Sequence, residues 1–188
     1  MRHSVISPDG TTIAFTYKGD IYTVPVAGGR AMQITTNPAY DTAPVWSPDS
    51  KRIAFASDRM GSLDVYIVAK DGGEPRRLTT HSGSETPLAF TDAGHVLFSA
   101  GIMPSAEAVV FPSNGQFNQV YRVSVEGGRP TMISSMPMEC ISINKEGAML
   151  YQDKKGYEDY WRKHHVSPIA RDIWMYTPGK EPQYRQLT

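Results

Sequence analysis

Short apolar stretches alternate with turn-forming residues along the whole chain, in an order that repeats four times. The apolar cores of the repeats are Ile13-Ala14-Phe15, Ile53-Ala54-Phe55, Val96-Leu97-Phe98 and Met149-Leu150-Tyr151. A second stretch then opens at Asp20-Ile21-Tyr22, Asp64-Val65-Tyr66, Gln119-Val120-Tyr121 and Asp172-Ile173-Trp174. These stretches are short and rich in Val, Ile, Tyr and Phe, which is typical of β-strands. No apolar face persists at helical spacing, so the pattern predicts an all-β chain.

Turn residues separate the predicted strands at regular positions. Each apolar core follows a turn, at Ser7-Pro8-Asp9-Gly10 and Ser47-Pro48-Asp49-Ser50 and, in weaker form, at residues 91–94 and 144–147. Glycine turns follow at residues 28–29, 72–73 and 127–128, with Pro178-Gly179 in the last repeat. Proline fixes φ, and Asp-Gly or Gly-Gly supplies the positive φ of a tight reversal. Successive repeats are roughly 40 to 53 residues apart, which is the spacing of four-stranded propeller blades.

Each repeat therefore predicts four short antiparallel strands. In the first repeat they cover residues 5–6, 13–16, 21–26 and 33–35, and the later repeats begin with strands at 43–47, 87–91 and 138–144. The predicted fold is a β-propeller whose four four-stranded antiparallel blades form part of a larger propeller of about six blades. One partial propeller covers residues 1–188, with blades at 1–36, 37–80, 81–135 and 136–188.

Each predicted blade comes from one contiguous stretch, so no strand from the far end of the chain completes a blade and closes a ring. We therefore expect an incomplete arc with apolar flanks on the first and fourth blades. Exposed apolar flanks favour self-association.

Composition narrows the range of partners. The chain is 40% hydrophobic and 20% charged, with a net charge of zero, which is typical of a globular protein and gives no electrostatic basis for nucleic-acid binding. No apolar run approaches the length of a membrane span, and no leader segment precedes the first repeat. Cys140 is the only cysteine, so no internal disulfide forms, and we expect its side chain to be buried as a small hydrophobe.

Sequence motifs for catalysis and for cofactors do not occur in the chain. There is no Gly-x-Ser-x-Gly string, no phosphate-binding glycine loop and no His-Glu-x-x-His spacing. The sequence accordingly predicts no catalytic, cofactor-binding or metal-binding residue. Asp20, Asp64 and Asp172 open the third strands of three repeats, and we expect them to accept hydrogen bonds from backbone or hydroxyl groups.

Two long loops indicate which face of the propeller is functional. Alternating strand direction puts the loops between second and third strands, and the connections between blades, on one face. In the third and fourth repeats these loops cover residues 99–118 and 152–171, a length that is usually functional. The loop of the fourth repeat contributes the candidate partner-contact residues, which are aromatic or basic: Tyr157, Tyr160, Trp161, Arg162, Lys163, His164, His165 and Arg171.

Two interpretations of this loop remain open. Its aromatic and basic residues could dock another domain or an acidic peptide end, with an arginine pairing a carboxylate. Alternatively, the aromatic side chains pin the loop onto the neighbouring blade while the cations stay solvated.

The turn and core motifs resemble a known repeat. Ser7-Pro8-Asp9-Gly10 with Ile13-Ala14-Phe15, and Trp46-Ser47-Pro48-Asp49 with residues 53–59, resemble the PD40 or TolB-like propeller repeat. Residues 155–165 followed by Arg171-Asp172-Ile173-Trp174 resemble the N-terminal propeller of tricorn-like peptidases of the S41 serine class.

The resemblance implies a non-catalytic propeller module that gates peptide access and product exit and serves as an interaction scaffold. Its implied partners are peptide or protein substrates and the catalytic domains of the parent protein, whose catalytic serine and histidine would lie beyond residue 188. It also implies a periplasmic or otherwise exported location. One alternative is a TolB-like binding propeller with no protease attached. A second is an all-β enzyme on the long-loop face, which would need converging groups with shifted pKa values.

Overall fold

The computed structural model describes residues 1–101, 118–136, 138–144, 146–153 and 171–188. These residues form four antiparallel sheets of four strands each. The first sheet contains β1 (Arg2–Ile6), β2 (Thr12–Tyr17), β3 (Asp20–Pro25) and β4 (Met32–Gln33). The second contains β5 (Asp41–Trp46), β6 (Arg52–Ser57), β7 (Asp64–Ala69) and β8 (Arg76–Arg77). The third contains β9 (Glu85–Asp92), β10 (His95–Ala100), β11 (Gln119–Ser124) and β12 (Thr131–Ser134). The fourth contains β13 (Met138–Ile143), β14 (Met149–Asp153), β15 (Ile173–Thr177) and β16 (Gln183–Gln186).

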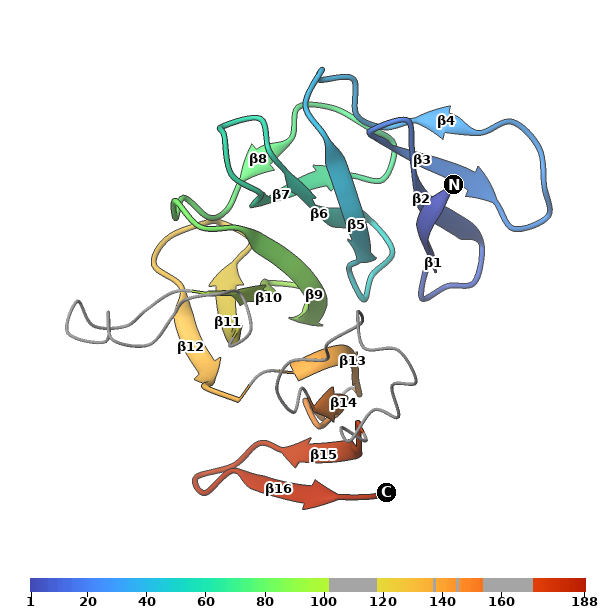
Figure 1. The fold of residues 1–188 in the computed structure, drawn as a ribbon. Helices are drawn as coiled ribbons and strands as arrows, with labels where there is room; N and C mark the ends of the chain where they lie inside the picture. The colour runs from blue at the N-terminus through green and yellow to red at the C-terminus, as the bar shows by residue number, and fades with distance from the viewer. Residues whose placement is uncertain (102–117, 137, 145, 154–170) are drawn as a thin grey trace, which may run out of the picture.

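The sheets are the blades of a β-propeller, which confirms the predicted fold class. In every sheet the strands pair in sequence order, so each blade is one contiguous meander. The first strands of successive blades pack against one another, β1 on β5, β5 on β9 and β9 on β13. Figure 1 shows the blades as an arc around these inner strands, with β4, β8, β12 and β16 on the outside and an opening between the first and fourth blades.

The apolar core lies between blades. One cluster joins Ala14, Ile21 and Ile34 of the first blade to Trp46, Ile53, Phe55, Tyr66 and Val68 of the second. A second cluster joins the second and third blades, and a third joins the third and fourth. A hydrogen bond from Trp46 Nε1 to the Val5 carbonyl, 3.2 Å long, also links the first two blades. Burial of apolar surface between blades thus stabilises the arc.

The outer face of the fourth blade has no blade packed against it among the described residues. Leu97 of the third blade is 0% exposed, but Leu150, at the matching position of the fourth, is 43% exposed. Ile173 pairs with Gln152, which lies two residues after Leu150 on the same strand. Ile173 and Leu150 are therefore on the same face of the sheet, and Ile173 is also exposed. The expected apolar flank is therefore present on this blade.

The prediction that Cys140 is buried is wrong. Its side chain is exposed, and its φ is +51°. The pairing of β13 with β14 shifts between Glu139 and Ser142, which places Cys140 in a β-bulge. His3 and Ala43 have the same positive φ at matching bulges in β1 and β5. The bulge recurs in these inner strands and turns the side chain away from the position that simple alternation predicts.

Candidate functional site

Most of the predicted contact residues lie outside the described part of the chain. This applies to Tyr157, Tyr160, Trp161 and to the basic run from residue 162 to residue 165. Arg171 is described, and its Nη1 donates a 2.7 Å hydrogen bond to Oε2 of Glu139 on β13 of the same blade. The contact role of these residues stays a prediction.

The face that carries these loops also holds polar groups where neighbouring blades meet. Strands β5 and β9 begin at Asp41 and Glu85, two residues earlier than the sequence pattern predicted, and both acidic side chains are buried. Matching polar residues at the boundary of blades one and two and at that of blades two and three are offset by 44 residues along the chain. We call Asp20, Gln33, Thr35, Asp41 and Arg59 the first junction, between blades one and two. We call Asp64, Arg77, Thr79 and Glu85 the second junction, between blades two and three.

A threonine frames each junction. The Oγ1 atom of Thr35 accepts a 3.0 Å hydrogen bond from the Ile21 backbone N–H, and Thr79 Oγ1 accepts one of 2.9 Å from Val65. Both threonines are buried, so each hydroxyl satisfies a backbone donor that water does not reach. The threonines therefore tie the end of each blade's last strand to the start of its third.

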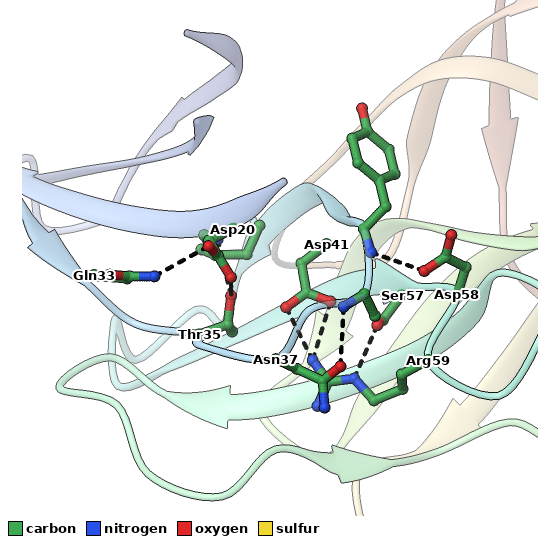
Figure 2. A network of polar contacts seen from close by, with 11 residues as sticks. Asp20, Gln33, Thr35, Asn37, Asp41, Ser57, Asp58 and Arg59 are labelled. Carbon is green, nitrogen blue, oxygen red and sulfur yellow. Dashed lines mark hydrogen bonds and ion pairs between the residues drawn. The ribbon is translucent and has the colours of Figure 1, made fainter. Parts of the chain in front are cut away.

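An ion pair closes the first junction. Asp41 is 0% exposed, and both its carboxylate oxygens accept hydrogen bonds from Arg59 Nη2, at 3.0 and 2.9 Å. Figure 2 shows Arg59 reaching Asp41 with its Nε also donating to Ser57 Oγ, at 2.9 Å. A buried carboxylate is stable in ionised form only when such a partner compensates its lost hydration.

Two stacked aromatic rings support the Arg59 guanidinium. Its Cζ lies 4.6 Å from the ring centroid of Tyr66 and 5.6 Å from that of Phe55. The rings themselves are stacked with centroids 5.9 Å apart. A guanidinium over an aromatic face is attracted to the negative face of the ring. Carboxylate, serine hydroxyl and ring pair together form a complete receptor for one guanidinium.

The second acidic group of the first junction bonds to neutral partners. Oδ2 of Asp20 accepts a 3.0 Å hydrogen bond from the Gln33 amide, and Oδ1 accepts one of 3.4 Å from the Thr35 hydroxyl (Figure 2). Burial, followed by the nearby Asp41 charge, raises the pKa of Asp20 above its ordinary value.

The second junction uses its arginine differently. Arg77 stands where the first junction has Gln33, and its Nη2 lies 2.9 Å from Oδ2 of Asp64, the counterpart of Asp20. Burial nevertheless raises the pKa of Asp64 above its ordinary value, although the hydrogen bond and charge of Arg77 act in the opposite direction. The arginine of this junction is thus paired with the third-strand carboxylate instead of the first-strand carboxylate.

Glu85 is left as a buried carboxyl with little compensation. It is 1% exposed, and neither carboxylate oxygen has an arginine or lysine partner within the described part of the chain. Burial, with a further contribution from the Asp64 charge, raises its pKa to about 7, against the opposing effects of the Thr79 hydroxyl and Arg77. At neutral pH this carboxyl is poised between its protonated and charged forms.

A groove of about 930 Å³ adjoins this carboxyl. It runs between the last strand of the second blade and the outer strands of the third, and its lining includes Thr79, His81, Glu85, Tyr121 and Met132. Tyr121 stacks on Phe98 with ring centroids 5.6 Å apart, and these two rings match Tyr66 and Phe55 of the second blade.

Uncharged side chains take the place of several of these groups at the junction between blades three and four, among the described residues. Gln119, Met132 and Ser134 take the places of the acidic, polar and threonine residues. Among residues that the structure describes, no group of three metal-ligating side chains is present, and no helix is long and apolar enough to cross a bilayer.

Sequence reasoning found part of this arrangement. Asp20 was expected to accept a hydrogen bond from a backbone or hydroxyl group, and its bond from the Thr35 hydroxyl confirms this. Asp64 instead pairs with Arg77, and Asp172 accepts a 3.0 Å hydrogen bond from the Gln186 side chain. The roles of Asp41, Arg59 and Glu85 were missed. Aligning the first three repeats at a 44-residue offset would have matched Asp41 with Glu85 and Gln33 with Arg77.

The fold defines a β-propeller module built from four-stranded antiparallel blades. The chain belongs to the family of tricorn protease N-terminal β-propeller domains, whose profile matches residues 1–188.

Sequence and structure comparisons also find similarity to tricorn and TolB proteins. Tricorn protease homolog 1 of Streptomyces coelicolor is 25% identical over 169 residues, which cover 89% of this chain and 15% of that protein. The Tol-Pal system protein TolB of Bordetella pertussis is 44% identical over 55 residues, covering 29% of this chain and 13% of that protein. The crystal structure of the tricorn protease superimposes with a TM-score of 0.69 at 13% identity, covering 97% of this chain and 22% of that one. The chain thus spans less than a quarter of each of these proteins.

Proposed function

We propose that this chain is the non-catalytic propeller module of a tricorn-like serine peptidase, and that it acts as a substrate and product gate and as an interaction scaffold. The observation that carries the proposal is the family match over the full 188 residues. The named tricorn relative is more than six times longer than the matched region, which leaves room for separate catalytic domains. The peptidase chemistry would then belong to those domains, and an exported location follows from the same resemblance.

The arrangement of the blades supports a gating role. Inner strands of successive blades line one side of the arc, and the polar junctions lie at the face where the long loops leave the sheets. A polypeptide that approached this face would lie over the charged groups at the blade boundaries. The proposed contacts with peptides or with the catalytic domains include Arg171 and the aromatic and basic residues from Tyr157 to His165.

Peptide hydrolysis by the full-length protein tests this proposal. The full-length protein and residues 1–188 are assayed side by side on a mixed peptide library, with a serine-reactive probe. We expect hydrolysis and labelling only in the full-length protein. If neither protein hydrolyses peptides or reacts with the probe, the peptidase proposal is overturned and the alternative gains support.

The alternative is a TolB-like propeller that binds a protein partner without an attached protease. The TolB relative, with 44% identity over its short matched region, favours this reading. A parent protein without a serine-reactive domain would support it.

We also propose that residues 1–188 alone self-associate through the exposed flank of the fourth blade. Leu150 and Ile173 supply an apolar face that a further blade would cover. Sedimentation of the isolated chain should show dimers or larger species, and Leu150→Glu should shift it toward monomer. An unchanged distribution in the variant would exclude this flank as the interface.

A further inference from the structure

We propose that the second junction is a receptor for the guanidinium group of an arginine side chain carried by a bound polypeptide, with Glu85 as its anion. The proposal deepens the gating function and rests on it in one respect, namely that a polypeptide supplies the arginine. The template for this receptor is inside the same molecule.

The first junction shows what such a receptor holds. There the first-strand carboxylate of Asp41 binds the Arg59 guanidinium, which also lies over the Tyr66 ring at 4.6 Å. The second junction repeats the carboxylate as Glu85 and the ring pair as Tyr121 and Phe98. The components that surround a bound guanidinium in one junction are therefore repeated in the next.

The chain does not fill the second receptor in the same way. Arg59 lies two residues after Ser57, in the loop between the second and third strands (β6 and β7) of the second blade. The corresponding loop of the third blade, residues 101–118 between β10 and β11, contains no arginine or lysine. Arg77, the described cation next to Glu85, is paired with Asp64 at 2.9 Å. Among the described residues, the one guanidinium of this junction therefore pairs with Asp64 and not with Glu85.

A groove lies next to the buried carboxyl. Glu85 lines a space of about 930 Å³ together with Thr79, His81 and Tyr121. The carboxyl is 1% exposed, and among the described residues no arginine or lysine bonds to its oxygens, so a cation bound there would form its ion pair away from bulk water. Charge-assisted hydrogen bonds formed in such surroundings are strong, and a planar guanidinium matches a carboxylate better than an ammonium does.

One difference from the template affects specificity. Ser57, which accepts the Arg59 Nε–H, is replaced at the matching position by Ala100. The bound guanidinium would therefore depend on Glu85 and the rings without this third contact. We expect binding to be weaker and more dependent on the carboxylate than the internal Arg59 contact is.

Release of a proton from Glu85 when a guanidinium binds would be a measurable sign of binding at this site. Glu85 is about half protonated near pH 7, and a bound guanidinium favours the ionised form. The charged or titratable groups around it and along the groove are Asp64 on β7, Arg77 on β8, His81 in the connection to β9, Tyr121 on β11, and Glu126 and Arg129 in the turn between β11 and β12. Binding near pH 7 should release about half a proton per site, which calorimetry in buffers of different ionisation enthalpy measures.

The test uses the full-length protein and three uncharged-terminus pentapeptides, in which the central residue is arginine, citrulline or lysine. Citrulline has the shape of arginine but no charge. We expect the arginine peptide to bind at least about tenfold more tightly than the citrulline peptide, and more tightly than the lysine peptide. Equal binding of the arginine and citrulline peptides would overturn the proposal.

Variants assign the binding to the site. Glu85→Gln should weaken arginine-peptide binding at least about tenfold and abolish the proton release, while Glu85→Asp, which keeps the anion, should retain most of both. Glu181→Gln removes a charge from the exposed turn of the fourth blade and should change neither. Circular dichroism checks that each variant is folded. Unchanged binding in Glu85→Gln would overturn the proposal.

The outcome is separable from that of the proposed function. Glu85-dependent binding in a protein that hydrolyses no peptide would retain the receptor and exclude the peptidase module. Peptide hydrolysis together with binding that does not depend on Glu85 would support the peptidase module and exclude the receptor.

Discussion

The first and second junctions are built on the same frame and differ in how their charges are compensated. Both join a third-strand aspartate, a threonine and a buried first-strand carboxyl, 44 residues apart along the chain. In the first junction Arg59 pairs with the first-strand carboxyl Asp41. In the second, Arg77 comes from β8 and pairs with the third-strand carboxyl Asp64, which leaves Glu85 with a pKa of about 7. The same frame thus holds a paired carboxylate where an arginine reaches the first strand, and a buried carboxyl of raised pKa where the arginine pairs with the third strand.

The largest expected effect is the loss of the first ion pair. Arg59→Ala leaves Asp41 buried and unpaired, so we expect the free energy of unfolding to fall by about 3–5 kcal/mol. Urea denaturation near pH 7 measures this loss. The control, Arg171→Ala, removes an exposed ion pair with Glu139 and should have a small effect.

The same variant can be used to sharpen the comparison. Without Arg59, the first junction has an open carboxylate beside two rings, as the second junction does. N-acetyl-arginine amide should therefore restore part of the stability of Arg59→Ala. A variant as stable as the unaltered protein would contradict the importance of the Asp41 pair.

The next effect concerns Glu85 and has a defined dependence on pH. Its folded pKa of about 7 lies above the ordinary value of 4.5, so the folded state binds the proton more tightly than the unfolded state does. The penalty for ionising Glu85 is therefore absent below about pH 4.5, grows as pH rises through about 7 and is constant above that. Glu85→Gln should remove the penalty and raise the free energy of unfolding by up to about 3 kcal/mol near pH 8.

Denaturation at several pH values tests this prediction. The difference in stability between Glu85→Gln and the unaltered protein should be larger near pH 8 than near pH 5. A difference that does not change with pH would show that Glu85 titrates normally.

The smallest effects come from the framing threonines. Thr35→Val and Thr79→Val each leave a buried backbone N–H without its acceptor, and each should cost about 1–3 kcal/mol. Thr188 accepts the same kind of bond from Ile173, 2.9 Å long, but is exposed. Thr188→Val should therefore cost less than either, because water can replace the hydroxyl. Equal losses at all three positions would contradict the role of burial.

The repeat pattern predicted the fold well because turn chemistry and strand composition are local properties. Proline, Asp-Gly and Gly-Gly turns mark each reversal, and the apolar cores mark the strands that pack between blades. Cys140 was predicted wrongly because a β-bulge changes which way a side chain points, and a bulge leaves little trace in an apolar pattern.

The junctions were harder to predict because they depend on contacts between blades. Asp20 and Asp64 occupy matching positions in sequence, but their partners are a glutamine and an arginine from the last strand of each blade. Asp41 and Glu85 lie just before the predicted first strands and resemble solvated loop residues in sequence. Only the packing of one blade on the next buries them.

An NMR titration of the Glu85 side-chain carboxyl, with and without the arginine pentapeptide, tests whether the second junction holds an uncompensated carboxyl that binds arginine. The account predicts a pKa of about 7 in the unliganded protein and a clear decrease when the peptide is bound. A pKa near the ordinary value of 4.5 would contradict an uncompensated carboxyl in the second junction. A raised pKa that the peptide leaves unchanged would contradict its role as the arginine receptor.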